Sequence, residues 1–266
     1  MVRMSPIQTL RRGAARRVDL VPMTPMEQLR AGSTVRRVSQ LLVGLWLYGT
    51  AMAMFIRAEL GLDPWDVFHY GVQDKVGWSF GTVVIVVGIL VLLLWIPLRQ
   101  WPGLGTIANV FVIGIATDVM LSVIETPDAL WLRVTMLLGG IVVNGIGGAM
   151  YIGSQYGPGP RDGLMTGLAR RTGLSIRLIR TGLEVTVLVI GWLLGGVVGV
   201  GTVLYALLIG PAVQAFLPLL TVRVTAPARR ARGDVDPSAV DSQGEGQDAV
   251  DPRAPELATS DGERPA

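Results

Sequence analysis

The amino-acid sequence predicts an all-α fold: a polytopic membrane bundle of six transmembrane helices, built from two inverted three-helix repeats that each carry a short extra amphipathic or re-entrant helix. Three observations predict it. Half of the 266 residues are apolar, and the mean hydropathy is +0.50. The apolar residues gather in stretches of about 20, the length of helix that crosses a hydrocarbon core of ~30 Å. The sequence also repeats itself after 96 residues.

The repeat is a gapless alignment of residues 37–121 with residues 133–217, in which 25 of 85 paired positions are identical. Coincidences of Leu and Val are common in apolar sequence, so the matches of Gly, Pro and Asp carry the information. These matches include Gly61 with Gly157, Pro64 with Pro160, and Asp66 with Asp162. Each copy holds three long apolar stretches, and an odd number of spans inverts the second copy in the membrane. Inverted repeats are the usual architecture of secondary transporters.

The chain divides into two membrane repeats and two tails. The predicted spans cover residues 38–56, 79–98, 104–124, 132–152, 175–194 and 197–219, which gives a first repeat over 36–124 and a second over 132–220. A soluble helical core is disfavoured, because residues 83–94 and 203–209 have no polar positions at helical period. The Arg-rich segment 1–35 and the acidic segment 225–266 are predicted to be disordered tails in the cytoplasm.

The orientation follows from the distribution of Lys and Arg around the spans. With both termini in the cytoplasm, 18 such residues flank the spans on the cytoplasmic side and three on the outer side: Arg57, Lys75 and Arg133. The positive-inside rule therefore favours this orientation.

The segment 158–174 is not counted as a span, because it carries four charged residues: Arg161, Asp162, Arg170 and Arg171. Placing a charge at the bilayer centre costs roughly 2.5–3.5 kcal/mol even on insertion scales. Three spans per repeat follow from this.

Composition also excludes several classes of function. The pI of about 9.7 reflects positive charge beside the apolar segments, so membrane topology explains it and we expect no nucleic-acid partner. The sequence has no cysteine, and His69 is its single histidine. We therefore predict no metal site and no cofactor, and we expect the protein not to be an enzyme.

A helix-start element occurs once in each repeat, as GLDPWD at residues 61–66 and GPGPRD at residues 157–162. Proline suits the first position of a helix, and a carboxylate in the first turn meets free N–H groups and the positive end of the helix dipole. Asp63 can cap the first helix, whereas Gly159 must cap the second. Each helix would run about 12 residues, to Gly77 or Gly173, which is too short to span.

Two interpretations of these short helices stay open. They could be amphipathic helices that lie at the membrane interface. Alternatively, they could be half-helices that dip inward and face one another across the midplane, where exposed backbone would build a binding site. Non-helical backbone at that depth is tolerated only where it lines a cavity or is buried in protein.

Charged residues inside the spans are further candidates, since intramembrane charges are costly. Glu184 lies nine residues into the fifth span, with Arg180 one turn before it, although the two could form a purely structural pair. Asp118 lies near the outer end of the third span and could simply reach the interface. The candidate pathway or substrate-binding residues are Asp66, His69, Asp118, Arg161, Asp162, Arg180 and Glu184; the repeated helix-start residues are Gly61, Pro64, Gly157 and Pro160.

Several of these motifs carry a resemblance to a known family. They are LGLDPWDVFH at 60–69, GPGPRDG at 157–163, RTGLE at 180–184, GWLLGG at 191–196 and GVGT at 199–202. Together they resemble the YczE/YyaS/YitT family of bacterial membrane proteins over residues 37–218. The resemblance implies a multi-pass protein of the bacterial plasma membrane. It implies no substrate and no site residues, because the family has no settled activity.

The sequence thus leads to a transporter or channel-like protein for an unknown small solute or ion, working by alternating access of the two halves. The alternative is a non-transporting membrane scaffold or regulator that acts through its tails or spans. A lipid-modifying enzyme based on Asp66 and His69 is disfavoured, since no nucleophile or metal set accompanies them. The expected partners are the lipid bilayer, the solute and possible further copies of the chain in a homo-oligomer.

Overall fold

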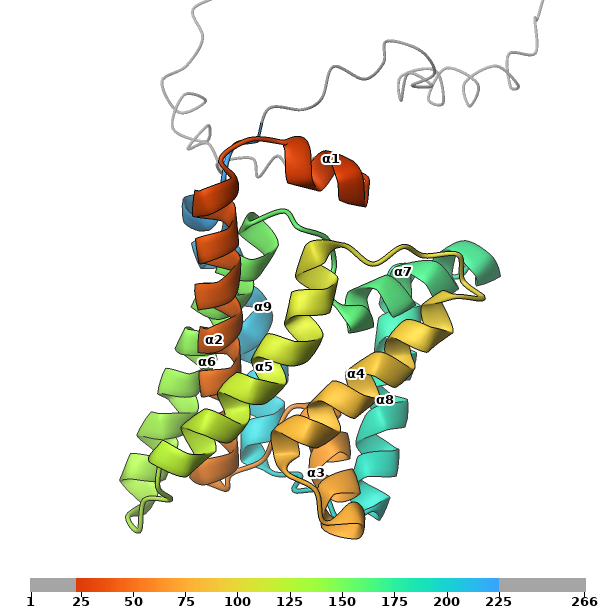
Figure 1. Cartoon of the computed structure of the whole chain (residues 1–266). Helices are drawn as coiled ribbons and strands as arrows, with labels where there is room; N and C mark the ends of the chain where they lie inside the picture. The colour runs from red at the N-terminus through yellow and green to blue at the C-terminus, as the bar shows by residue number, and fades with distance from the viewer. Residues whose placement is uncertain (1–22, 225–266) are drawn as a thin grey trace, which may run out of the picture. The chain divides into compact units, whose positions relative to one another are not determined.

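The computed structural model describes residues 23–224, and within that range it contains nine α-helices and no strand (Figure 1). The helices are α1 (Pro25–Arg30), α2 (Thr34–Ala58), α3 (Pro64–Val76), α4 (Phe80–Trp95), α5 (Leu104–Val123), α6 (Leu130–Gly153), α7 (Pro160–Thr172), α8 (Ile176–Leu193) and α9 (Val200–Leu220). Residues 1–22 and 225–266 lie outside the described range, which leaves out most of the predicted N-terminal tail and all of the predicted C-terminal tail.

Four helices, α2, α5, α6 and α9, are long and apolar enough to cross a membrane. A fifth span is added if α3 and α4, which bend by 112° at a short break, are counted together. Helix α8 has 18 residues but carries Arg177, Arg180 and Glu184. Residues 23–224 are thus all-helical, with four or five segments long and apolar enough to be spans, and the count of six stays a prediction.

The predicted N-terminal tail is too long, because α1 forms inside the range that the sequence assigns to disorder. Thr24 and Glu27 make a capping box: the Thr24 side chain accepts a hydrogen bond from Glu27 N, and the Glu27 carboxylate accepts one from Thr24 N. Pro25 occupies the first helical position, where its missing N–H is no loss. Six residues are too few to show hydrophobic periodicity, so the sequence pattern did not reveal this helix.

The helices of the two halves begin 96 residues apart. The paired first residues are Thr34 and Leu130, Pro64 and Pro160, Phe80 and Ile176, and Leu104 and Val200. Backbone turns with positive φ pair in the same way: Glu59 with Gln155, Gly61 with Gly157, Gly77 with Gly173, and Arg99 with Gly195. The secondary structure therefore recurs at the spacing found in the sequence.

The short helices begin and end as their sequences predict. Each has 13 residues with proline at the first position, and each ends at a glycine, Gly77 or Gly173, with φ of 72°. The Asp63 side chain caps α3 by accepting a hydrogen bond from Asp66 N at 2.9 Å, and Gly159 is the N-cap of α7 without a side-chain bond. These predictions are confirmed.

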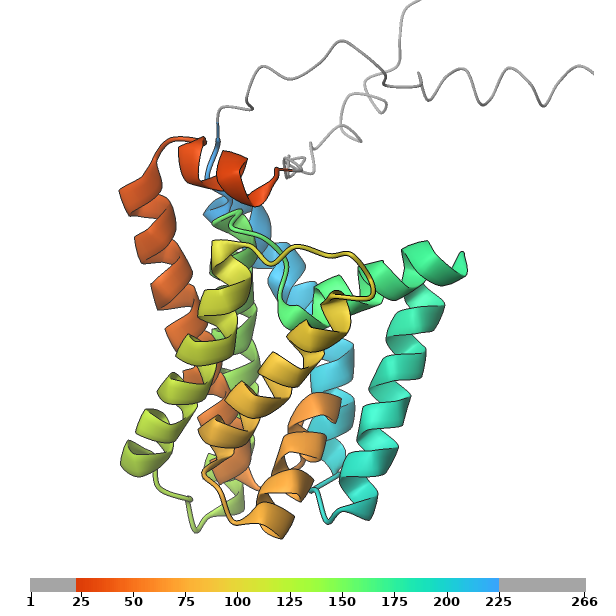
Figure 2. The ribbon, with the colours of Figure 1, turned by 45° about the vertical axis from the view of Figure 1, so that its right-hand side comes forward.

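The long helices α2 and α6 form the most extensive helix pair of the bundle (Figure 2). They approach closely where Gly44 meets Gly147: a Cβ added to Gly147 would lie 2.8 Å from the Gly44 carbonyl oxygen. Small residues at a helix crossing allow this backbone approach. Helix α5 packs on α2 and α9 on α6, while the short helices cross over, α3 onto α8 and α7 onto α4.

The loop before each short helix is bonded to the last helix of the other half. Gly201 N donates to the Leu60 carbonyl at 2.7 Å, and Gly105 N donates to the Tyr156 carbonyl at 2.9 Å. Gly61 has a φ of 116°, and a Cβ there would lie 2.7 Å from Gly199 N, so only glycine fits this turn. These two reciprocal contacts fix where α3 and α7 begin.

Candidate functional site

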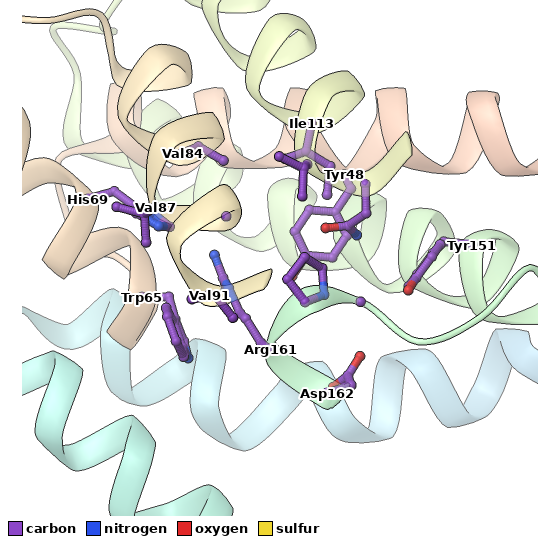
Figure 3. Close-up of a pocket in the computed structure, with 15 residues that line it drawn as sticks. Tyr48, Trp65, His69, Val84, Val87, Val91, Ile113, Tyr151, Arg161 and Asp162 are labelled. Atoms are coloured by element: carbon purple, nitrogen blue, oxygen red, sulfur yellow. The ribbon is translucent and has the colours of Figure 1, made fainter. Parts of the chain in front are cut away.

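A cavity of about 120 Å³ lies where the N-terminal ends of α3 and α7 come near one another (Figure 3). One wall is apolar and consists of Val84, Val87 and Val91 of α4, with Ile113 of α5. The polar and aromatic side chains of the lining come from five helices: Tyr48, Trp65, His69, Asn109, Tyr151, Arg161 and Asp162. The cavity therefore combines an apolar wall with a few polar groups, which is the usual make-up of a small-molecule site.

The central charge of the site is Arg161, in the first turn of α7. Its Nη1 lies 3.9 Å from Asp63 Oδ1, its Nη2 lies 3.8 Å from Asp66 Oδ1, and its guanidinium carbon lies 4.8 Å from the centre of the Trp65 ring. Both carboxylates belong to the start of α3, so the second half of the chain supplies the cation and the first half its partners. At these distances they are ion pairs without direct hydrogen bonds.

The α3 carboxylates are held by the helix start itself. Asp63 is 3% exposed and caps the helix, and Asp66 is completely buried in the first turn. Both positions face the positive end of the helix dipole, which stabilises their charge. His69, one turn later, places Nδ1 3.2 Å from Asp66 Oδ1 and packs edge-on against Phe80. Among residues 23–224, Asp66 Oδ2 has no hydrogen-bond partner.

The loop that leads into α7 is fixed through its carbonyl groups. The Tyr151 hydroxyl donates to the Gly157 carbonyl at 3.1 Å, Thr106 Oγ1 donates to the Pro158 carbonyl at 2.7 Å, and Trp95 Nε1 donates to the Pro160 carbonyl at 3.0 Å. Since its carbonyls are paired by side chains from three other helices, this non-helical backbone is tolerated inside the bundle.

Asp162 follows Arg161 in the first turn of α7 and is exposed. Its carboxylate lies beside Gly159, the N-cap residue that cannot provide a side-chain cap of its own. No Lys or Arg nitrogen of the described chain lies within 4.0 Å of this carboxylate, and Arg161 and Arg180 are its more distant cationic neighbours. The site thus holds three carboxylates and one guanidinium.

The structure brings Asp66, His69, Arg161 and Asp162 together, and all of these except Asp66 line the cavity. Asp118, Arg180 and Glu184 do not line it. On α8, Arg180 and Glu184 form an ion pair of 2.9 Å on a half-exposed surface. Asp118 of α5 caps the start of α4 instead: it accepts hydrogen bonds from Gly81 N at 2.7 Å and Ser79 Oγ at 2.5 Å.

The helix-start residues have separate roles. Gly61 and Gly157 make the turns before the short helices, while Pro64 and Pro160 begin them. Pro160 also lines the cavity.

Sequence reasoning missed part of the site. It assigned Asp63 a capping role only, whereas the residue is also an ion-pair partner of Arg161. It also did not single out Tyr48, Asn109 or Tyr151 as cavity residues. A signal was available for some of them, because the 96-residue shift pairs Trp65 with Arg161, Tyr48 with Asn144, and Asn109 with Tyr205. Polar or aromatic residues therefore recur at cavity positions in both halves.

Within the described range, no group of three His, Asp or Glu side chains is arranged to hold a metal ion. The arrangement offers ion pairing, hydrogen bonding and aromatic faces to a solute.

Fold and site together define the class: a multi-pass helical membrane protein with an ion-paired cavity between two short helices. The chain belongs to the family of unknown function DUF6198, which matches residues 35–218. It is 38% identical over 185 residues to an uncharacterised protein of Haemophilus influenzae, covering 70% of this chain and 85% of that protein.

Two proteins of Bacillus subtilis are also similar. The uncharacterised membrane protein YczE is 31% identical over 177 residues, covering 66% of this chain and 82% of YczE. The uncharacterised protein YyaS is 25% identical over 182 residues, covering 67% of this chain and 90% of YyaS. No solved structure matches the chain. The resemblance that the sequence motifs carry is therefore confirmed, and the relatives bring no activity with it.

Proposed function

We propose that the protein is a transporter that moves a small solute across the bacterial plasma membrane by alternating access of two inverted halves. One observation carries the proposal: Arg161 at the start of α7 pairs with Asp63 and Asp66 at the start of α3, beside a cavity. Binding sites formed by helix starts from the two halves are typical of transporters with inverted repeats. In this proposal α3 and α7 are re-entrant helices, and both termini lie in the cytoplasm.

The reciprocal loop contacts support the inverted organisation. The carbonyl of Leu60 binds the start of α9, and the carbonyl of its repeat counterpart Tyr156 binds the start of α5. A two-fold axis between the halves produces such a reciprocal pair of contacts, in which the loop of each half binds the last helix of the other.

A difference between the halves supports two alternating states. Helices α4 and α5 pack closely: a Cβ added to Gly114 would lie 2.6 Å from the Gly81 carbonyl oxygen and 2.7 Å from Ile85. Their counterparts α8 and α9 make almost no contact, and a Cβ at Gly210 would meet no atom within 4 Å. In Figure 2, α8 leans away from α9 toward α7. One half is therefore closed and the other open.

The sequence contributes to this difference. Arg177 stands where the first repeat has Gly81, and Glu184 stands where it has Gly88. In the opposite state α8 closes on α9 while α4 separates from α5. A scaffold or regulator, the alternative function, gives no role to buried charges beside a cavity or to one open helix pair.

The test is solute uptake by the full-length protein in liposomes, using a panel of small cationic, anionic and zwitterionic solutes. Alternating access is tested with the double variant Thr181→Cys/Gly210→Cys. These two positions are the repeat counterparts of Ile85 and Gly114, which are in contact between α4 and α5, so a cross-link between the two cysteines would hold α8 against α9. We expect uptake of at least one solute above protein-free liposomes, its loss when the two cysteines are cross-linked, and its return on reduction. If no solute is taken up, or if the cross-linked protein remains as active as the reduced one, the proposal is wrong.

A further inference from the structure

The charges at the cavity do not balance. Asp63 and Asp66 share one guanidinium, that of Arg161, and the Asp162 carboxylate has no ion pair within residues 23–224. The described Lys and Arg residues provide no second cation within 4.0 Å of these three carboxylates. An incoming positive charge would restore the balance, whereas an anion would add to the excess.

The two helix starts do not reverse this preference. A helix N-terminus normally attracts anions. Here Asp63 and Asp66 occupy the positive end of α3, and Asp162, in the first turn, occupies that of α7. A solute anion near Arg161 would therefore be repelled by carboxylates that already occupy the positive ends of both helix dipoles.

The aromatic lining provides faces on which a cation can bind. The Arg161 guanidinium carbon lies over the Trp65 ring, 4.8 Å from its centre, and Tyr48 and Tyr151 line the same cavity. Aromatic faces beside carboxylates are the usual setting for ammonium and guanidinium recognition. Asp162 lines the cavity, and no Lys or Arg of the described chain pairs with its carboxylate within 4.0 Å, so an acceptor remains for a donor on the solute.

We infer that the solute is a small organic cation, a protonated amine or guanidinium compound, bound between Asp162 and the aromatic rings next to the Arg161–Asp63–Asp66 group. The inference rests on the proposed transport function, because it names the chemical class of solute for that site. Arg161 then acts as a tethered counter-ion that holds the α3 carboxylates while the cavity is empty and shares them with the bound cation.

The test is a binding measurement on the purified full-length protein in detergent, read as the shift in Tm with methylguanidinium chloride or with sodium acetate at equal ionic strength. A ligand that binds only the folded state raises Tm. We expect methylguanidinium to raise it and acetate not to. Asp162→Asn should abolish the shift, Asp162→Glu should restore it, and Asp74→Asn should leave it unchanged, because Asp74 is an exposed carboxylate farther along α3.

The inference would be overturned if only acetate raised Tm, or if neither probe raised it. An equal rise with methylguanidinium in the Asp162→Asn variant would also overturn it. Methylguanidinium uptake in liposomes separates it from the transport proposal. Binding without any uptake would leave the cation site standing and contradict transport. Uptake of an anionic solute without methylguanidinium binding would support transport and contradict the cation site.

Discussion

Replacing Arg161 with methionine is expected to lower the free energy of unfolding by about 3 kcal/mol, the lower end of the range for breaking a buried ion pair. The substitution keeps an apolar stem next to Trp65 but leaves Asp63 and Asp66 without the guanidinium that lies 3.8–3.9 Å from them. Two buried carboxylates would then have no counter-charge. Unfolding of the purified protein by denaturant in detergent measures the loss.

A second set of variants separates this charge effect from lost packing. In the background Asp63→Asn/Asp66→Asn, the Arg161→Met substitution should cost much less, because neither partner carboxylate of Arg161 remains to lose its counter-charge. If the same substitution costs as much in that background as in the natural chain, the ion pairs do not stabilise the site and our account of its charges is wrong.

Replacing Arg37 with methionine is expected to lower the free energy of unfolding by about 5 kcal/mol or more, since each of the three hydrogen bonds that its charged guanidinium donates contributes about 1.5–3 kcal/mol. Arg37 is completely buried. It donates to the carbonyls of Gln28 at 2.7 Å, Ser154 at 2.9 Å and Gln155 at 2.9 Å, and it stacks 4.1 Å from the Tyr156 ring centre. The substitution would leave these carbonyls without their donor, and it would loosen the loop that leads to α7.

The neighbouring residue offers a matched control. Arg36 is exposed on the same helix, so Arg36→Met should change stability by less than about 0.5 kcal/mol, as surface substitutions usually do. Chemical unfolding of the two variants side by side makes the comparison. Equal losses in both would show that overall charge, and not the buried clamp, is responsible.

The local parts of the fold were predictable from sequence because short-range rules determine them. Proline at the first helical position, a carboxylate in the first turn and glycine at the end are enough to mark α3 and α7. The 96-residue repeat then extends the assignment from one half to the other. Helix α1 was missed because its signal is a capping box on six residues and not an apolar period.

The contacts between distant segments were not predictable in the same way. Asp63 and Arg161 are 98 positions apart, and nothing local to either indicates the other. Arg37 entered the topology count as one of many cytoplasmic charges, yet it is a buried donor to a loop more than 110 residues away. A charge at the end of an apolar stretch can mark topology or pair inside the bundle, and only the tertiary structure distinguishes the two.

Inversion of the two halves is the central claim, and one labelling experiment tests it most directly. The chain has no cysteine, so single cysteines can be introduced at Trp78 and Leu174, which are 96 residues apart and 51% and 48% exposed. The measurement is reaction with a membrane-impermeant maleimide in intact cells and in inside-out vesicles. We predict that Trp78→Cys reacts from the outside and Leu174→Cys from the cytoplasmic side. Labelling of both from the same side would contradict the inverted repeat and, with it, the transport mechanism.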